Sequence, residues 1–475
     1  MDFNPAIIRA YDVRGQVGPQ VNNDFAYGLG KAYGTVIRRS GGQKVSVGWD
    51  TRFTSPNLAK SFTQGVISSG CNVVSLGLVT TPISYFSVVS LKLDGGAMIT
   101  GSHNTAGVNG FKLCSRDADP ICGEPLRQLA GILKANDFEE GAGVLEDNII
   151  LLEAYKEDLL ARVSISRPVK IVLDCGNGAA SNIAIDVFKR IGCEVTSLFC
   201  DIRGGFWQHN PDPEVPENLK DLAENVRKYK AEFGIAFDSD GDRIGIVDEK
   251  GIFYESDKVL LLLAKDILSR YPNHRVLYDV KGSYIVDEEV KKYGGIPVLF
   301  RTGRSDFRRA MKENPNIILG GELSGHFFIA DNHFGYDDGI FAALRLVSVI
   351  SNSSKTFSSH FADVPRTFHT QELMPSCSDE RKFEVVGEVA EFFRKEYQTI
   401  EIDGVRILFD DSSWALIRAK NTTPALSLRF EAKTKNRLQE IIDIVYQKLK
   451  SYNDVETDWY QQAQDKINER YSNHF

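Results

Sequence analysis

Three segments of the chain repeat one pattern of apolar and polar positions. Each begins with a short apolar run that ends near an aspartate, continues through a turn into a helical stretch, and returns to an apolar run after a glycine. The first runs span residues 44–50, 169–174 and 275–279, and the returning runs follow Gly70, Gly192 and Gly294. The pattern predicts a strand-helix-strand unit that occurs three times.

A further apolar strand follows each of these units and ends beside polar residues. These strands end near Ser102, Asp238 and Glu322. Ligands of open α/β sheets bind beyond the carboxyl ends of the strands. Three domains of similar topology would therefore deliver three polar loops to one cleft.

The last quarter of the chain has a different pattern. It predicts a helix near 380–395, an amphipathic helix near 433–450, and strands near 400–403, 406–409, 414–418 and 426–432. We interpret this segment as an antiparallel sheet with helices packed on one face. The polar tail from Asn453 to Phe475 receives no predicted role.

The predicted fold class is α/β, with three consecutive α/β domains of similar topology and a C-terminal α+β domain around one central cleft. A chain of 475 residues is too long for one ordinary domain. The expected domains are residues 1–150, 151–253, 254–365 and 366–475.

Composition narrows the possible partners. Hydrophobic residues make up 42% and charged residues 25%, and no apolar run is long enough to cross a bilayer. The N-terminal residues lack the basic and apolar regions of a secretory signal, so we expect a cytoplasmic protein without a membrane partner. A net charge of −8 disfavours nucleic acid, and seven scattered cysteines predict reduced thiols without a zinc cluster.

An acidic turn, Asp238-Ser239-Asp240-Gly241-Asp242, lies between two apolar strands. Alternation directs its three carboxylates to one side, where a hard cation would allow all three to remain ionised. Mg²⁺ is favoured, with Ser102 or its phosphate as a further ligand. An EF-hand is one alternative, because Glu249 occupies its twelfth position, although Arg243 stands where that loop needs glycine. A solvated acidic turn is the other.

Three more loops carry candidate chemistry. Thr100-Gly101-Ser102-His103-Asn104 presents a hydroxyl, an imidazole and an amide, although such residues also form ordinary turns. The loop at residues 321–326 offers a carboxylate, a hydroxyl and an imidazole, or alternatively a capped helix start. The loop at 418–424 places two cations beside amide and hydroxyl groups, which suits a dianionic phosphate better than a solvated basic turn.

These four loops, in this order and at these intervals, resemble those of the α-D-phosphohexomutases, with the closest likeness to bacterial phosphomannomutase/phosphoglucomutase. The resemblance extends from Arg9-Ala10-Tyr11-Asp12 to Leu428-Arg429-Phe430 and includes Asn109-Gly110-Phe111-Lys112. It implies that Ser102 carries a phosphoryl group and that the acidic turn holds Mg²⁺ beside it. A phosphoserine has about 1.5 to 2 negative charges, which a buried cleft must compensate.

The resemblance also assigns roles to the other loops. It implies that Glu322 and Ser324 read sugar hydroxyls, that His326 contacts a phosphate or the ring, and that the 418–424 loop grips the phosphate that is not transferred. Arg14 and Lys112 match acid/base positions, which requires lowered pKa values, and His103 is an alternative proton carrier. Two positions depart from the family: Lys420 replaces a usual serine and Arg304 a common histidine.

The predicted site falls into three groups of residues. The catalytic group is Ser102, Arg14, Lys112 and His103, and the metal ligands are Ser102, Asp238, Asp240 and Asp242. The substrate-binding group is Tyr11, Arg243, Lys281, Arg304, Glu322, Leu323, Ser324, Gly325, His326, Arg418, Lys420, Asn421 and Thr422.

The implied function is a phosphohexomutase that interconverts hexose 6-phosphate and hexose 1-phosphate, of mannose and also of glucose. Ser102 would donate its phosphate to give a hexose 1,6-bisphosphate, which turns end for end and returns the other phosphate. Such a cycle also predicts a mobile fourth domain and no partner beyond a small phosphosugar, in a monomer or weak dimer.

Three alternatives remain open at this point. One is a phosphoglucosamine or phospho-N-acetylglucosamine mutase of the same family. Another is a non-catalytic sugar-phosphate binding protein, which would need neither a phosphorylatable Ser102 nor metal ligands. The third is a nucleotide-binding enzyme that uses the loop at Gly176 and Gly178, with Asp201 as the ribose partner.

Overall fold

The computed structural model describes residues 2–147, 150–202, 204–420 and 423–472. The chain divides into two compact units. The first comprises Met1–Leu277, Tyr293–Ile296 and Gly303–Ala362, and the second comprises Tyr278–Lys292, Pro297–Thr302 and Asp363–Phe475.

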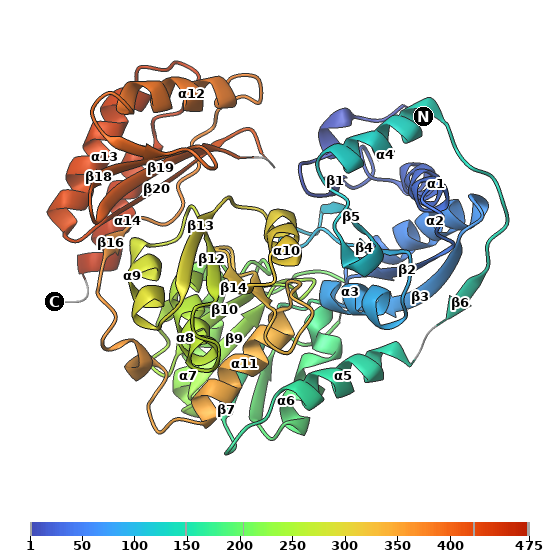
Figure 1. The fold of residues 1–475 in the computed structure, drawn as a ribbon, viewed down its shortest axis with the longest axis horizontal. Coiled ribbons are helices and arrows are strands. Elements are labelled where there is room, and N and C mark those ends of the chain that lie inside the picture. The colour runs from blue at the N-terminus through green and yellow to red at the C-terminus, as the bar shows by residue number, and fades with distance from the viewer. Residues whose placement is uncertain (1, 148–149, 203, 421–422, 473–475) are drawn as a thin grey trace. The chain divides into compact units, whose positions relative to one another are not determined.

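The first sheet has the order β1-β5-β4-β2-β3-β6 (Figure 1). Its central strands β2 and β4 are parallel, and β5 returns antiparallel to β4. Its strands are β1 Val13–Gln16, β2 Lys44–Trp49, β3 Asn72–Leu78, β4 Gly95–Ile99, β5 Val108–Ser115 and β6 Leu145–Asp147. Its α-helices are α1 Asn23–Arg39, α2 Ser55–Ser68, α3 Thr81–Ser90 and α4 Glu124–Ala135, with 3₁₀ turns at Pro5–Ile7 and Arg116–Ala118.

The second sheet repeats the parallel unit and ends in an antiparallel hairpin. Its order is β11-β10-β9-β7-β8. The strands are β7 Lys170–Asp174, β8 Glu194–Leu198, β9 Phe233–Phe237, β10 Ile244–Asp248 and β11 Phe253–Tyr254. The helices are α5 Leu151–Arg162, α6 Ala184–Arg190 and α7 Lys220–Tyr229, with 3₁₀ turns at Ala179–Asn182 and Pro216–Leu219.

The third sheet has the order β13-β12-β14-β15. Its strands are β12 Arg275–Asp279, β13 Ile296–Phe300, β14 Ile317–Gly321 and β15 Phe327–Ile329. The associated helices are α8 Ser256–Arg270, α9 Tyr284–Lys292, α10 Arg304–Glu313 and α11 Gly339–Ser351, with a 3₁₀ turn at Ser358–Phe361. Helix α11 has many buried apolar positions and begins with the Asp338 side chain as its N-cap.

The fourth sheet is antiparallel, with the order β16-β20-β19-β18-β17. Its strands are β16 Phe368–His369, β17 Gln398–Ile400, β18 Val405–Asp410, β19 Ser413–Ala419 and β20 Leu426–Ala432, and its helices are α12 Lys382–Phe393, α13 Lys435–Leu449 and α14 Trp459–Ser472. The tail that received no predicted role forms α14. Trp459 stacks on Phe430 with ring centroids 5.8 Å apart, so this helix completes the core of the domain.

The predicted fold class is confirmed: three α/β segments precede an α+β segment. The three repeated first strands correspond to β2, β7 and β12, and the strands that end beside the polar loops are β4, β9 and β14. Among the described helices, none combines the length and the apolar character needed to span a bilayer.

Candidate active site

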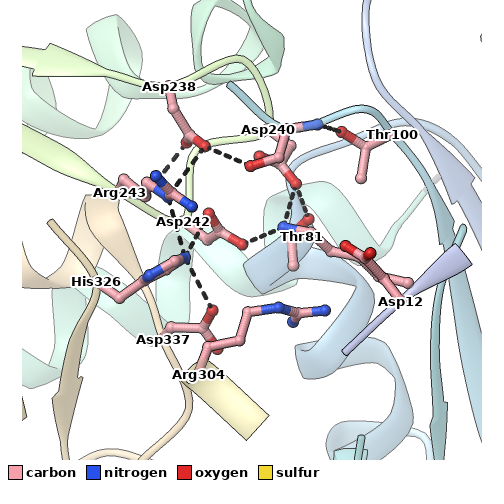
Figure 2. A network of polar contacts seen from close by, with 12 residues as sticks. Asp12, Thr81, Thr100, Asp238, Asp240, Asp242, Arg243, Arg304, His326 and Asp337 are labelled. Atoms are coloured by element: carbon pink, nitrogen blue, oxygen red, sulfur yellow. Dashed lines mark hydrogen bonds and ion pairs between the residues drawn. The ribbon is translucent and has the colours of Figure 1, made fainter. Parts of the chain in front are cut away.

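The acidic turn connects β9 to β10, which pair antiparallel. Asp238, Asp240 and Asp242 are fully buried, and their ligand oxygens lie within 4.8 Å of one another (Figure 2). Gly241 has φ +72°, and its left-handed backbone closes the turn. Flanking strands rule out an EF-hand, and full burial rules out a solvated turn. Glu249, the twelfth position of that alternative, instead accepts hydrogen bonds from Ser358.

Lys112 on β5 neutralises part of this acidic cluster. Its Nζ lies 2.6 Å from Asp240 Oδ2 and also contacts Asp242 Oδ2. Burial acts to lower the pKa of Lys112, but these two carboxylates outweigh burial and raise it. The lowered pKa on which an acid/base role depended in the sequence analysis is therefore not found for Lys112.

The three aspartates do not share one protonation behaviour. Burial, together with the Asp240 and Asp242 charges, raises the pKa of Asp238 well above its usual range. Burial also acts to raise the pKa values of Asp240 and Asp242, but the Lys112 ammonium helps to hold both below the usual range. Although Arg243 Nε also lies 4.0 Å from Asp238 Oδ2, burial and the neighbouring carboxylates outweigh its charge at Asp238.

The residues fit a hard divalent cation. Within the described part of the chain, the buried Oδ1 atom of Asp240 has no hydrogen-bond donor, and that of Asp242 has His326 Nε2 at 3.4 Å. Buried carboxylate oxygens without donors are costly unless an ion binds them. Oxygen ligands of this kind suit Mg²⁺.

Ser102 lies at the start of the loop after β4 and faces this turn. Its Oγ donates to Asp238 Oδ2 at 3.0 Å and lies 3.4 Å from His103 Nδ1. Its backbone has φ +49°, a left-handed conformation that is strained for serine, and its N–H donates to Thr100 Oγ1. The predicted carrier hydroxyl and metal ligands are therefore adjacent.

His103 and Arg14 flank the same loop. Burial, with the Arg243 and Arg14 charges, lowers the pKa of His103 well below its usual value, so its imidazole is neutral at pH 7. Arg14 on β1 pairs with Asp12 at 2.5 Å. Both residues remain proton-transfer candidates by position.

The loop between β14 and β15 joins the acidic turn through His326. Arg243 and His326 form a backbone bridge, and Arg243 Nε lies 3.2 Å from His326 Nε2. The other ring nitrogen, Nδ1, lies 3.0 Å from Glu322 Oε2. Burial and Arg243 act to lower the pKa of His326, but Asp242 and Glu322 raise it. A strand-turn-strand connection also excludes the capped helix start as an explanation of this motif.

The remaining predicted residues of this loop lie beside His326. Ser324 Oγ is 3.2 Å from His326 Nδ1, and Leu323 is buried. The carboxylate of Glu322 also accepts a hydrogen bond of 2.6 Å from Gly303 N. This bond connects the loop to the start of α10.

Arg304 is the first residue of α10, and its Nη1 donates to the hydroxyl of Tyr85. Its pKa is raised well above the usual value: burial opposes the charge, but Tyr85, Asp337 and Asp242 favour it. Tyr11 lies against the preceding Gly303, where an added Cβ would come within 2.6 Å of the ring. Arg304 and Tyr11 therefore both belong to the polar region around the acidic turn.

A second polar cluster lies within the other unit and contains Lys281, Arg418 and Lys420. Glu372 joins two of them, with Nζ distances of 3.4 Å from Lys281 and 3.7 Å from Lys420, and it accepts a hydrogen bond from Ser427. Arg418 pairs with Asp403 at 2.9 Å. The predicted residues Asn421 and Thr422 lie outside the described residues.

Sequence reasoning missed several polar residues of these clusters. Thr81, the first residue of α3, donates from Oγ1 to Asp240 Oδ2 at 2.6 Å and from N to Asp240 O at 2.8 Å. The sequence could have indicated Thr81 as a helix-start residue, because Thr80-Thr81-Pro82 is typical of a helix start and directly follows an apolar strand. Asp337 and Glu372 had no comparable local signal.

The Gly176–Gly178 loop is not arranged for a dinucleotide. The amide of Asn177 donates to Phe199 O, that of Gly178 to Cys175 O, and that of Ala179 to Ser239 O. An added Cβ at Gly178 would lie 2.7 Å from the Ser239 backbone. Gly178 therefore packs closely against the acidic turn and Gly176 against Pro211, and the amides of both glycines donate to acceptors within the protein instead of to a pyrophosphate.

Comparisons with known proteins agree with this geometry. Family models described as phosphoglucomutase/phosphomannomutase alpha/beta/alpha domains I, II and III match residues 6–140, 152–251 and 255–368, and the model of the C-terminal domain matches residues 376–448.

Individual relatives match over most of the chain. A phosphomannomutase/phosphoglucomutase of Pseudomonas putida is 38% identical, covering 92% of this chain and 94% of its own. A phosphoglucomutase of Neisseria gonorrhoeae is 37% identical, covering 92% and 95%. The crystal structure of a phosphoglucomutase/phosphomannomutase family protein from Burkholderia thailandensis has a TM-score of 0.88 at 34% identity, covering 95% and 98%. The chain belongs to the phosphoglucomutase/phosphomannomutase family.

Proposed function

We propose that this protein is a phosphohexomutase that interconverts the 6-phosphate and 1-phosphate of mannose and of glucose through phosphorylated Ser102. The observation that carries the proposal is the 3.0 Å hydrogen bond from Ser102 Oγ to a fully buried group of three carboxylates. A serine that only shaped a turn would not need this environment. A non-catalytic sugar-phosphate sensor would not need it either.

Phosphorylated Ser102 transfers its phosphoryl group to the free hydroxyl of a bound hexose phosphate. The bond from phosphorus to Ser102 Oγ breaks and a bond to the sugar oxygen forms. The sugar hydroxyl gives up its proton, and Ser102 Oγ gains one and becomes a hydroxyl again. The product of this half-reaction is a hexose 1,6-bisphosphate. After the bisphosphate turns end for end, its other phosphoryl group returns to Ser102 and the isomeric monophosphate leaves.

The acidic turn is the proposed metal site. Asp238, Asp240, Asp242 and the Ser102 oxygen would hold Mg²⁺, which supplies positive charge beside the phosphoryl group when bound. Lys112 pairs with Asp240 and Asp242. Three carboxylates and a phosphoserine would exceed the positive charge of Lys112 and Arg243, so a divalent ion would supply the further compensation.

Proton transfer is assigned by position to Arg14, Lys112 and His103. The His103 Nδ1 atom lies 3.4 Å from the carrier oxygen. Lys112, which is held charged by two carboxylates, is better suited to stabilise negative charge than to accept a proton.

Substrate recognition is divided between the two polar clusters. Glu322 and Ser324 would bind sugar hydroxyls, while His326, Arg243, Arg304 and Tyr11 would contact the ring or a phosphate. Lys281, Arg418 and Lys420, with Asn421 and Thr422, would hold the phosphate that is not transferred. Lys420 adds a cation to this group, and Arg304 can bind a phosphate but is a poor proton donor.

We also propose domain boundaries at residues 1–150, 151–253, 254–365 and 366–475, and a monomer or weak dimer in solution. The four family models match within or close to these ranges. Sedimentation velocity over a range of concentrations tests the oligomeric state.

The function is tested by coupled assays of mannose 1-phosphate and glucose 1-phosphate with a trace of glucose 1,6-bisphosphate. We expect turnover of both sugars by the native chain and a loss of at least about 10³-fold in Ser102→Ala, because the carrier hydroxyl is removed. Mass analysis should find phosphate on Ser102 after incubation with the bisphosphate. Equal turnover by the two proteins, or no phosphate on Ser102, would contradict the proposal.

A further inference from the structure

Arg52 belongs to the segment between β2 and α2. Its side chain, however, lies within the loop that follows β4. Its side chain is about 1% exposed, and the neighbouring Asp50 is fully buried. The ring of Phe206 covers the guanidinium, with 4.8 Å between Cζ and the ring centroid. No role has so far been given to this buried cation beside the carrier serine.

Every N–H of the Arg52 guanidinium has an acceptor. An arginine side chain offers five donors in a planar fork. Nε donates to Val108 O at 3.0 Å, Nη2 donates to Ser102 O at 2.7 Å and Asn104 O at 2.5 Å, and Nη1 donates to Ser239 Oγ at 2.9 Å and to Asp50 Oδ2. Two of these acceptors are main-chain carbonyls of residues 100–107, the carrier loop between β4 and β5, and a third belongs to Val108 at the start of β5, so the loop is wrapped around the guanidinium.

The packing of Gly101 shows how closely the loop fits this group. A Cβ at Gly101 would lie 2.9 Å from Arg52 Nε and Cζ and 2.6 Å from Val108 O. Only a glycine allows the backbone before Ser102 to approach Arg52 this closely. Because all five donors are occupied, Arg52 has none left for a phosphate oxygen.

Ser239 extends the contact from the carrier loop to the acidic turn. Its Oγ accepts from Arg52 Nη1 and donates to Ser102 O at 2.6 Å. Ser239 stands between Asp238 and Asp240 in the sequence, so its hydroxyl joins the main chain of Ser102 to the carboxylates that Ser102 Oγ faces. The Ser102 carbonyl is thus held by two donors from two different segments.

We propose that Arg52 and Ser239 form a positioning pair that fixes the strained backbone of Ser102 at the distance from the acidic turn needed for phosphoryl transfer. This inference rests on the proposed function. Neither residue touches the reacting atoms. Their contribution is geometric, and displacement of a reacting group by about 1 Å can cost about 10²-fold in rate.

The test measures single-turnover phosphorylation of Ser102 by glucose 1,6-bisphosphate in Ser239→Ala. We expect the rate to fall about tenfold while KM for the hexose phosphate stays unchanged, because sugar recognition lies in other loops. Ser87→Ala is the matched control: Ser87 is also fully buried, and its hydroxyl contacts Ser46 Oγ and Ser84 O away from the carrier loop. It should lose comparable stability and keep the native phosphorylation rate.

Arg52→Lys provides the second variant, because an ammonium has three donors and cannot replace a planar fork of five. We expect a fall in phosphorylation rate of about 10²-fold in protein that remains folded. If folded Ser239→Ala and Arg52→Lys both phosphorylate at the native rate, the inference is wrong, although native phosphorylation would still support the carrier role of Ser102. If Ser87→Ala slows phosphorylation as much as Ser239→Ala, a general loss of stability explains the effect and the inference also fails.

Discussion

The two polar clusters of this protein have opposite charge but a related construction. In the first, the ammonium of Lys112 pairs with Asp240 and Asp242, which lie in one group with Asp238. In the second, Glu372 lies between the ammonium groups of Lys281 and Lys420. The charges within each cluster are thus partly paired: Arg243 Nε also lies 4.0 Å from Asp238 Oδ2 in the first, and Arg418 pairs with Asp403 in the second.

This comparison suggests how a ligand site remains stable without its ligand. A buried group of like charges is costly unless opposite charge compensates it. A partial counter-ion reduces the cost in the free protein and leaves an excess that favours binding: of a cation in the first cluster, of a phosphate in the second. The two clusters differ in burial, because the carboxylates are fully buried while the Glu372 side chain is 13% exposed.

The largest expected effect on activity comes from removing the negative charge of Asp240, a proposed ligand of the cation. Asp240→Asn should lower turnover about 10²- to 10³-fold and raise the Mg²⁺ concentration for half-maximal activity, because a ligand of the cation loses its charge. Unfolding stability should change little without Mg²⁺, since repulsion in the cluster also falls. Steady-state kinetics over a Mg²⁺ titration and denaturant unfolding provide the measurements.

Asp248→Asn is the matched control for this change. Asp248 is also fully buried and lies on β10, but its carboxylate accepts from the amides of Lys250 and Ile252, away from the cluster. Its Mg²⁺ dependence should remain native. An unchanged Mg²⁺ dependence in Asp240→Asn would contradict the assigned metal site.

Removing the counter-ion of the acidic cluster should affect stability next most strongly. Lys112→Met leaves Asp240 and Asp242 uncompensated, which should cost about 3 kcal/mol of unfolding free energy in the presence of a chelator. Saturating Mg²⁺ should stabilise this variant more than the native protein, because the ion then replaces the missing charge. Equal stabilisation of both by Mg²⁺ would show that Lys112 and the ion do not compensate the same carboxylates.

Removing the counter-ion of the basic cluster should strengthen phosphate binding. Glu372→Gln eliminates a negative charge that competes with phosphate for Lys281 and Lys420, and we expect Kd for hexose 1,6-bisphosphate to fall about tenfold, or about 1.4 kcal/mol. Calorimetric titration measures the change. Glu401→Gln is the control, because it removes an exposed partner of Arg394 and should leave Kd unchanged. Weaker binding in Glu372→Gln would contradict the prediction and would mean that Glu372 mainly orients the two lysines.

The smallest effect concerns acid stability. Burial opposes the charge of Glu372, but Lys281 and Lys420 lower its pKa well below the usual value. A lowered folded-state pKa contributes stability above the unfolded value of about 4.3, and this contribution is lost as pH falls through the folded value. Glu372→Gln should therefore show a shallower loss of unfolding free energy below pH 4 than the native chain, with no difference in slope between pH 6 and 7. If the unfolding free energies of Glu372→Gln and the native chain fell with the same slope below pH 4, the prediction would be wrong.

The sequence by itself determined the domain pattern and most of the loops that carry chemistry. Apolar periodicity is local, so it identified β2, β7 and β12, the strands that end beside Ser102, Asp238 and Glu322, and the C-terminal sheet. The alternating carboxylates also form a local pattern, which is why their convergence could be predicted from one turn.

Tertiary structure alone decided which distant groups compensate and position these loops. Lys112 reaches Asp240 and Asp242 from another domain, Glu372 meets Lys281 through packing, and Arg52 binds carbonyls of the carrier loop. Every residue has a main-chain carbonyl, so the sequence does not show which carbonyls accept a hydrogen bond from a distant side chain such as Arg52. The tail likewise received no predicted role, because the burial of Trp459 against Phe430 depends on a strand that the sequence does not mark as its partner.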